Sequence, residues 1–68
     1  MSIRGMRIGD TIIGVDMQST YTVEQKGHDT VKARRTEAPK RLKTFKAADL
    51  ECVDADEGLW QEMQPVSW

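Results

Sequence analysis

A chain of 68 residues and 7.7 kDa has room for one domain, which excludes two-domain enzymes and repeat arrays. Hydrophobic residues make up 38% and charged residues 31%, with a mean hydropathy of −0.59. The chain is therefore too apolar for an obviously disordered tail and too polar for a membrane span. A chain this short buries only about 60% of its unfolded surface, so deep pockets are not expected.

The start of the chain and its cysteine content indicate the compartment. The basic residues near the N-terminus are followed by no apolar run, so no secretory signal is recognised. The longest aliphatic cluster, residues 12–15, is far shorter than a bilayer span. The single cysteine, Cys52, cannot form an internal disulfide, the staple that a small extracellular domain would need. We expect a cytoplasmic protein of a bacterium or phage that does not associate with membranes.

The charge is distributed unevenly along the chain. Residues 1–46 hold all ten Lys and Arg against five acids, a net of +5, whereas residues 47–68 hold six acids and no base, a net of −6. Such asymmetry is typical of a basic working surface followed by an acidic tail. It is equally typical of two surfaces that neutralise each other within the fold.

Short β-rich runs separated by turn residues predict a small all-β domain. In chain order, the expected strands are residues 11–15, 20–24, 30–35, 41–45 and 51–53, with a 3₁₀ turn at residues 47–50. Residues 26–29 are expected to form a tight connection, in which Gly27 is the residue that tolerates a positive φ.

Alternation along these strands predicts which side chains form the core. The inward set in the second and third strands is Tyr21, Val23, Val31 and Ala33. Leu42 and Phe45 are three residues apart, so both reach the core only if a bulge or bend intervenes. Cys52, in the closing strand, is expected to be a small buried hydrophobe.

Residues 54–68 differ from the barrel of residues 1–53, and we treat them as an acidic, Trp-containing tail or short helix. At i, i+1 and i+4, Leu59, Trp60 and Met63 would share one face of that helix. Trp side chains in an acidic segment are typical of a docking element or dimer contact. The alternatives are that Trp60 caps an open end of the barrel and that Trp68 frays. The candidate protein-binding residues are Leu59, Trp60, Met63 and Trp68.

This pattern resembles the SH3-like small β-barrel, including the KOW, Tudor-like and related bacterial domains. The resemblance is carried by residues 8–12 at the start, residues 21–23 and 27–31 in the middle hairpin, and residues 45–53 at the end. Over roughly residues 7–53 it implies a five-stranded barrel with a long second loop and a 3₁₀ turn before the last strand. Fold alone does not give function.

The closing part of the pattern is also faintly similar to the type II dihydrofolate reductases, which build one active site in a tetramer of such barrels. Their Val-Gln-Ile-Tyr strand is matched here by Leu42-Lys43-Thr44-Phe45, which lacks the Gln amide and the Tyr hydroxyl. An oligomeric reductase is therefore a distant alternative, and the chain is expected not to be an enzyme. No cofactor or metal is expected, because His28 has no second ligand at metal spacing.

The basic segment between Lys32 and Lys46 contains seven bases and one acid, Glu37. Its candidate nucleic-acid-binding residues are Lys32, Arg34, Arg35, Lys40, Arg41 and Lys43. Alternation is expected to place four of them, two from the third strand (Lys32 and Arg34) and two from the fourth (Arg41 and Lys43), on one outer face. Like charges across a ladder repel, a cost that a polyanion or an acidic partner would relieve. Tyr21 and Phe45 are expected in the core, with stacking on bases as the alternative if the rings are exposed.

We expect a non-enzymatic binding module, for which two classes of partner compete. The first is a protein, bound through the Trp-bearing tail or an exposed sheet edge. The chain would then be a small phage or bacterial modulator or a structural subunit, with a homo-oligomer as one form. The alternative is an RNA or DNA backbone, bound on the basic face with little base selectivity and a steep salt dependence. The two hypotheses are compatible if the acidic tail lies over the basic face, because the tail would then compete with nucleic acid for that face.

Overall fold

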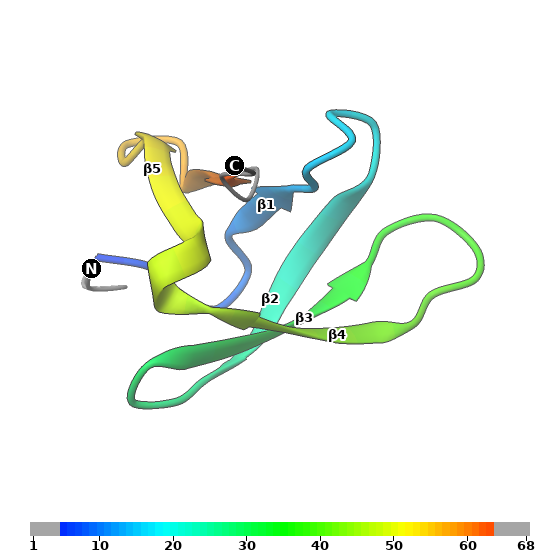
Figure 1. Ribbon diagram of the computed structural model, residues 1–68, viewed down its shortest axis with the longest axis horizontal. Helices are drawn as coiled ribbons and strands as arrows, with labels where there is room; N and C mark the ends of the chain where they lie inside the picture. Colours follow the sequence, from blue (N-terminus) through cyan, green and yellow to red (C-terminus); the bar gives the residue numbers. More distant parts are fainter. Residues whose placement is uncertain (1–4, 64–68) are drawn as a thin grey trace, which may run out of the picture.

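Residues 5–63 are described by a computed structural model, in which they form one curled sheet (Figure 1). The strands are β1 (Thr11–Ile13), β2 (Thr20–Lys26), β3 (Thr30–Arg35), β4 (Leu42–Lys46), β5 (Leu50–Asp54) and β6 (Leu59–Glu62), with a 3₁₀ turn, η1 (Ala47–Asp49), before β5. Their order is β4-β3-β2-β1-β6-β5, with β1 and β6 parallel and the other neighbours antiparallel. The architecture is a small all-β half-barrel with β4 and β5 at its two edges.

The predicted strand pattern is confirmed over most of its length. β3 spans the residues predicted for it, and η1 lies where a 3₁₀ turn was expected. β1 ends at Ile13 because the chain turns at once: the N–H of Gly14 donates to the Ser19 carbonyl at 2.7 Å. The Asp16 carboxylate holds this turn by accepting the N–H groups of Gln18 (2.9 Å) and Ser19 (2.8 Å).

The predicted C-terminal helix is wrong, because residues 59–62 form β6 between β1 and β5. The domain therefore has six strands rather than five. The turn before β6 uses Gly58 at φ 63, where a Cβ atom would collide with the Asp10 carboxylate. The strand was not predicted because Glu62 occupies a position at which strand alternation calls for an apolar residue.

Within residues 5–63, no helix is long and apolar enough to cross a membrane.

The core fills the concave side of the sheet. Its buried residues are Met6, Ile12, Val23, Val31, Ala33, Phe45, Ala47, Leu50 and Trp60, and half-buried Tyr21 packs against them. The inward orientations predicted for β2 and β3 are confirmed. Leu42 stays 46% exposed, because the β3–β4 ladder runs without a bulge and turns only Phe45 inward.

Two smaller features complete the comparison. Gly27 lies in the expected connection but without a positive φ; a Cβ atom there would lie 2.9 Å from Thr30 Oγ1 and 3.3 Å from the Thr30 carbonyl oxygen. Cys52 is exposed rather than buried, because β5 is an edge strand with a neighbour on one side only.

Candidate nucleic-acid interface

The register of β3 against β4 decides which cations share a side of the sheet. Lys32 lies opposite Thr44, whereas Ala33 lies opposite Lys43. Residues directly opposite in an antiparallel ladder point to the same side. Because Ala33 is buried on the concave side, Lys43 also points to the concave side, and Lys32 and Arg34 point to the convex side.

The single outer face of four cations is therefore a wrong prediction. A face with Arg41 and Lys43 on the outside requires Leu42 to point inward. In the β3–β4 ladder the inward residue is Phe45, which has the same parity as Lys43. Arg41 continues the alternation of Lys43 and Phe45, and its carbonyl accepts the N–H of Arg35 at 3.0 Å. The structure thus divides the predicted cations between the two sides of the sheet.

Three of the cations meet an aromatic ring at one end of the concave side. Tyr21 lies opposite Arg35 in the β2–β3 ladder and packs edge-on against Phe45, with ring centroids 5.1 Å apart. The groove formed there has a volume of about 320 Å³, and we call it the concave groove. It is lined by Tyr21, Arg35, Pro39, Arg41, Leu42 and Lys43.

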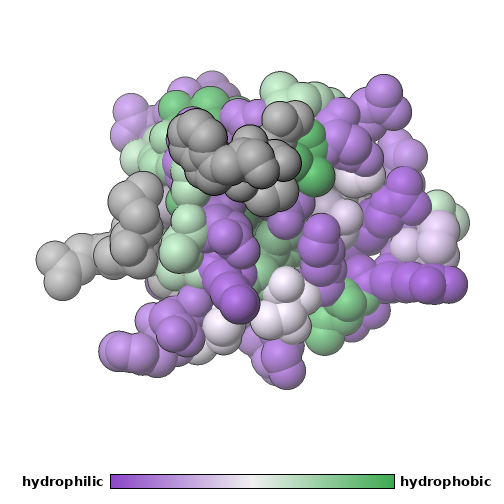
Figure 2. All heavy atoms as spheres, in the orientation of Figure 1, coloured by the Kyte–Doolittle hydropathy of each residue, from purple (hydrophilic) through white to green (hydrophobic). Residues whose placement is uncertain are grey.

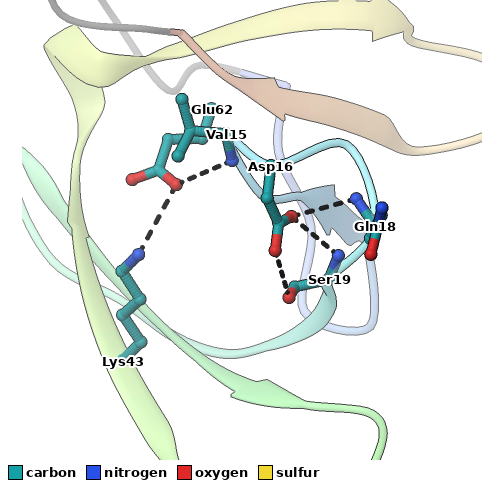
Figure 3. A network of polar contacts seen from close by, with 6 residues as sticks. All are labelled: Val15, Asp16, Gln18, Ser19, Lys43 and Glu62. Carbon is teal, nitrogen blue, oxygen red and sulfur yellow. Dashed lines mark hydrogen bonds and ion pairs between the residues drawn. The ribbon is translucent and has the colours of Figure 1, made fainter.

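Lys43 is held above the aromatic pair by an ion pair that crosses the curl of the sheet (Figure 3). Its Nζ atom lies 4.9 Å from the Phe45 ring centroid and 5.6 Å from that of Tyr21. The same Nζ atom is 3.5 Å from Oε1 of Glu62, an oxygen that also accepts the N–H of Val15 at 3.1 Å. β4 and β6 are not neighbours in the sheet, so this contact ties its two arms together.

Arg35 is oriented by the loop that follows β3. Its Nη1 atom donates to the Ala38 carbonyl at 3.1 Å. Nearby, the N–H groups of Ser19 and Gln18 lower the pKa of Asp16 to about 2, with smaller contributions from the Ser19 hydroxyl and the charge of Arg35. Asp16 is therefore ionised at neutral pH, and an acid lies close to the basic groove.

The convex side of the β3–β4 hairpin is less available than its charge suggests. Arg34 binds Glu24 in two contacts, Nε to Oε2 at 2.8 Å and Nη2 to Oε1 at 3.2 Å. The hydrogen bond from Arg34 also lowers the pKa of Glu24. Lys32 is exposed and forms no ion pair within the described part of the chain. The cation-rich surface that keeps an apolar, aromatic lining is therefore the concave groove.

The three candidate protein-binding residues within residues 5–63 do not form one surface. Trp60 is 5% exposed and donates its Nε1–H to Asp10 Oδ2 at 3.1 Å, so it belongs to the core. Leu59 is its neighbour along β6 and points to the opposite side of the sheet, half-buried. Met63 is half-buried directly after β6. Trp68 lies outside the described residues.

One residue beside the groove was not predicted to act there. Tyr21 was expected in the core with base stacking as the alternative, and the shared parity of Lys43 and Phe45 was a signal that cations lie on the aromatic side. No sequence signal identified Glu62, because its contacts with Val15 and Lys43 join residues 47 and 19 positions apart.

The fold and the groove together define a small all-β half-barrel with a basic, aromatic-lined cleft. No family model matches the chain, and no curated protein or solved structure is similar enough to show a relationship.

Proposed function

We propose that the protein is a non-enzymatic binding module whose concave groove holds single-stranded nucleic acid. One observation carries the proposal: the β3–β4 register turns Arg41 and Lys43 to the same side of the sheet as Tyr21. Cations bind phosphates, and an aromatic ring stacks on a base. Sites for single strands commonly combine the two.

The lining of the groove favours a single strand over a duplex. The bases of a duplex are stacked inside the helix and present only their edges to a protein. An unpaired base offers its face to Tyr21, while the adjacent phosphates contact Arg35 and Arg41. Because phosphate contacts carry no sequence information, we expect little base selectivity.

The local charge favours a polyanion even though the whole chain carries a net charge of −1. Two cations of the β3–β4 hairpin are neutralised by acids of other strands, Arg34 by Glu24 and Lys43 by Glu62. The remaining hairpin cations are Lys32, Arg35, Lys40, Arg41 and Lys46. Hydrophilic side chains cover most of the molecular surface over the β3–β4 loop in Figure 2. Neutralising phosphates there releases counterions, which makes affinity fall steeply with salt.

The first prediction separates the two sides of the hairpin. Arg41→Glu is expected to weaken binding to a single strand by roughly tenfold or more, because it reverses a charge in the groove. Lys32→Glu is the matched control: it changes the net charge equally but acts on the convex side, so we expect a loss below about threefold. Both side chains are exposed and form no hydrogen bond within the described residues, so both variants should fold. Fluorescence anisotropy of a labelled oligonucleotide measures the effect.

The same titration includes a duplex of the same sequence and two salt concentrations, about 50 mM and about 200 mM. Tighter binding of the single strand and loss of affinity at the higher salt are the expected results. Equal losses in the two variants would show that affinity follows net charge and not the groove. Absence of binding at the lower salt would end the proposal.

A protein partner is the second candidate, favoured by the two edges of the sheet. Among residues 5–63, β4 and β5 each have one neighbouring strand, and an extended segment of a partner can pair with such an edge. Val53, on β5, is 49% exposed and would lie within such an interface. Binding at β5 would be indifferent to Arg41→Glu, so that variant distinguishes the two candidates.

We also propose that the half-barrel belongs with the SH3-like small barrels of the KOW or Tudor-like kind, acting in the cytoplasm. Support comes from the consecutive antiparallel strands β1 to β4 and the 3₁₀ turn before β5, as in the resembling pattern. β6 is the departure from that five-stranded pattern.

A further inference from the structure

One group of bases and one group of acids lie far apart in the fold, although Lys43 pairs with Glu62 and Arg7 borders the same cavity as Asp56 and Glu57. The β3–β4 loop and the β5–β6 turn lie at opposite ends of the long axis (Figure 1). That axis measures 33 Å, several times the screening length of about 8 Å at physiological salt. The two ends therefore do not neutralise each other through solvent. Neither ion pair of the described residues involves the β5–β6 turn.

The acidic end is a turn of defined shape. Asp54 Oδ1 accepts the N–H groups of Asp56 at 3.0 Å and Glu57 at 3.3 Å, so the Asp54 side chain is used in holding the turn. The carboxylates of Asp56 and Glu57 are exposed and accept no hydrogen bond within the described residues. We call residues 54–58 the acidic turn.

The basic end has the complementary arrangement. We define it as Arg35, Lys40 and Arg41, which border the β3–β4 loop next to the concave groove. Lys40 and Arg41 are exposed, and neither forms an ion pair within the described residues. The acidic segment with its two projecting carboxylates is opposite in sign to this surface, which holds three bases and one loop acid, Glu37.

We propose that the acidic turn of one copy of this chain docks on the basic end of a second copy. The two surfaces differ and lie at opposite ends of the molecule, so the contact is head to tail and not two-fold symmetric. Exposed ion pairs are individually weak and screened by salt, so the association is weak and salt-sensitive. The self-association does not rest on nucleic-acid binding. If the groove also holds nucleic acid, the second copy competes with it for Arg41.

The test reverses each end separately. Asp56→Lys with Glu57→Lys makes both ends basic, and Lys40→Glu with Arg41→Glu makes both ends acidic. Sedimentation velocity without nucleic acid at low salt is expected to show dimers and larger species of the unaltered chain, which dissociate at about 0.3 M salt. Each double variant alone is expected to be monomeric. An equimolar mixture of the two variants should associate again, because opposite charges then meet at both contacts.

The control makes an equal charge change elsewhere. Asp29→Lys with Asp49→Lys alters two exposed acids of the β2–β3 turn and η1, and this variant should associate like the unaltered chain. A monomeric chain at low salt overturns the inference. So does equal dissociation in the control variant, or a variant mixture that stays monomeric. Since no nucleic acid is present, none of these results bears on the proposed function.

Discussion

Removal of residues 55–68 is expected to unfold the protein. The deletion removes β6, which pairs with β1 on one side and with β5 on the other. It also removes Trp60 from the core, and losing a large buried aromatic side chain alone costs about 3–5 kcal/mol. The whole stability of a chain this short is roughly 3–10 kcal/mol. Division of the chain into a barrel of residues 1–53 and a tail of residues 54–68 predicts the opposite, a folded barrel after truncation.

Circular dichroism with thermal melting measures this effect. The shortened chain should show no cooperative transition, whereas removal of residues 64–68 alone keeps all six strands and should leave a cooperative melt. A cooperative melt of residues 1–54 would contradict the placement of β6 in the sheet.

Trp60→Ala is expected to lower the free energy of unfolding by about 3–5 kcal/mol. Trp60 lies opposite Ile12 in the parallel β1–β6 ladder, and both are buried. Its Nε1–H donates to Asp10 Oδ2, an atom that also accepts the N–H of Arg7 at 2.9 Å. Trp60→Phe keeps most of the apolar contact and loses the donor, so we expect a smaller cost of about 1–2 kcal/mol.

Chemical denaturation of the two Trp60 variants gives these free energies. Val53→Ala is the comparison, because Val53 is 49% exposed on neighbouring β5 and should change stability by only about 0.5 kcal/mol. A Trp60→Ala protein as stable as the Val53→Ala protein would place Trp60 outside the core and restore it as a docking residue.

The elements that could be predicted from the sequence are those whose own residues are enough to determine the type of element and its buried side. In β3, Val31 and Ala33 alternate with Lys32 and Arg34, so both the strand and its buried side follow from the residues alone. The 3₁₀ turn η1 is equally local, because it needs only its own few residues.

The predictions are wrong where pairing with a strand distant in the sequence decides which side chains point inward. In β4, Leu42 and Phe45 have opposite parity, and only the pairing of Val31 with Phe45 decides which of them is inward. The spacing of Leu59, Trp60 and Met63 fits a helix as well as a strand. Glu62 obscures the strand pattern because it is an acid on the inner side of β6, where it contacts Val15 in the β1–β2 turn and Lys43 on β4.

The candidate site shows the same division. The sequence predicted Arg35, Arg41 and Lys43 as candidates for a binding surface, because their charge density is a local property. It placed Arg41 and Lys43 on the convex side, because the side depends on the long-range register of β4. A shift of one residue in a strand turns every side chain to the opposite side.

Side-chain NMR signals followed during titration with a single-stranded oligonucleotide test the location of the binding surface most directly. Binding in the concave groove predicts the largest shifts for the Tyr21 ring and the Nε–H groups of Arg35 and Arg41. The Arg34 Nε–H group and the Thr44 methyl group, on the convex side, should change little. Shifts confined to Arg34 and Thr44, or no shifts at low salt, would contradict a nucleic-acid site in the concave groove.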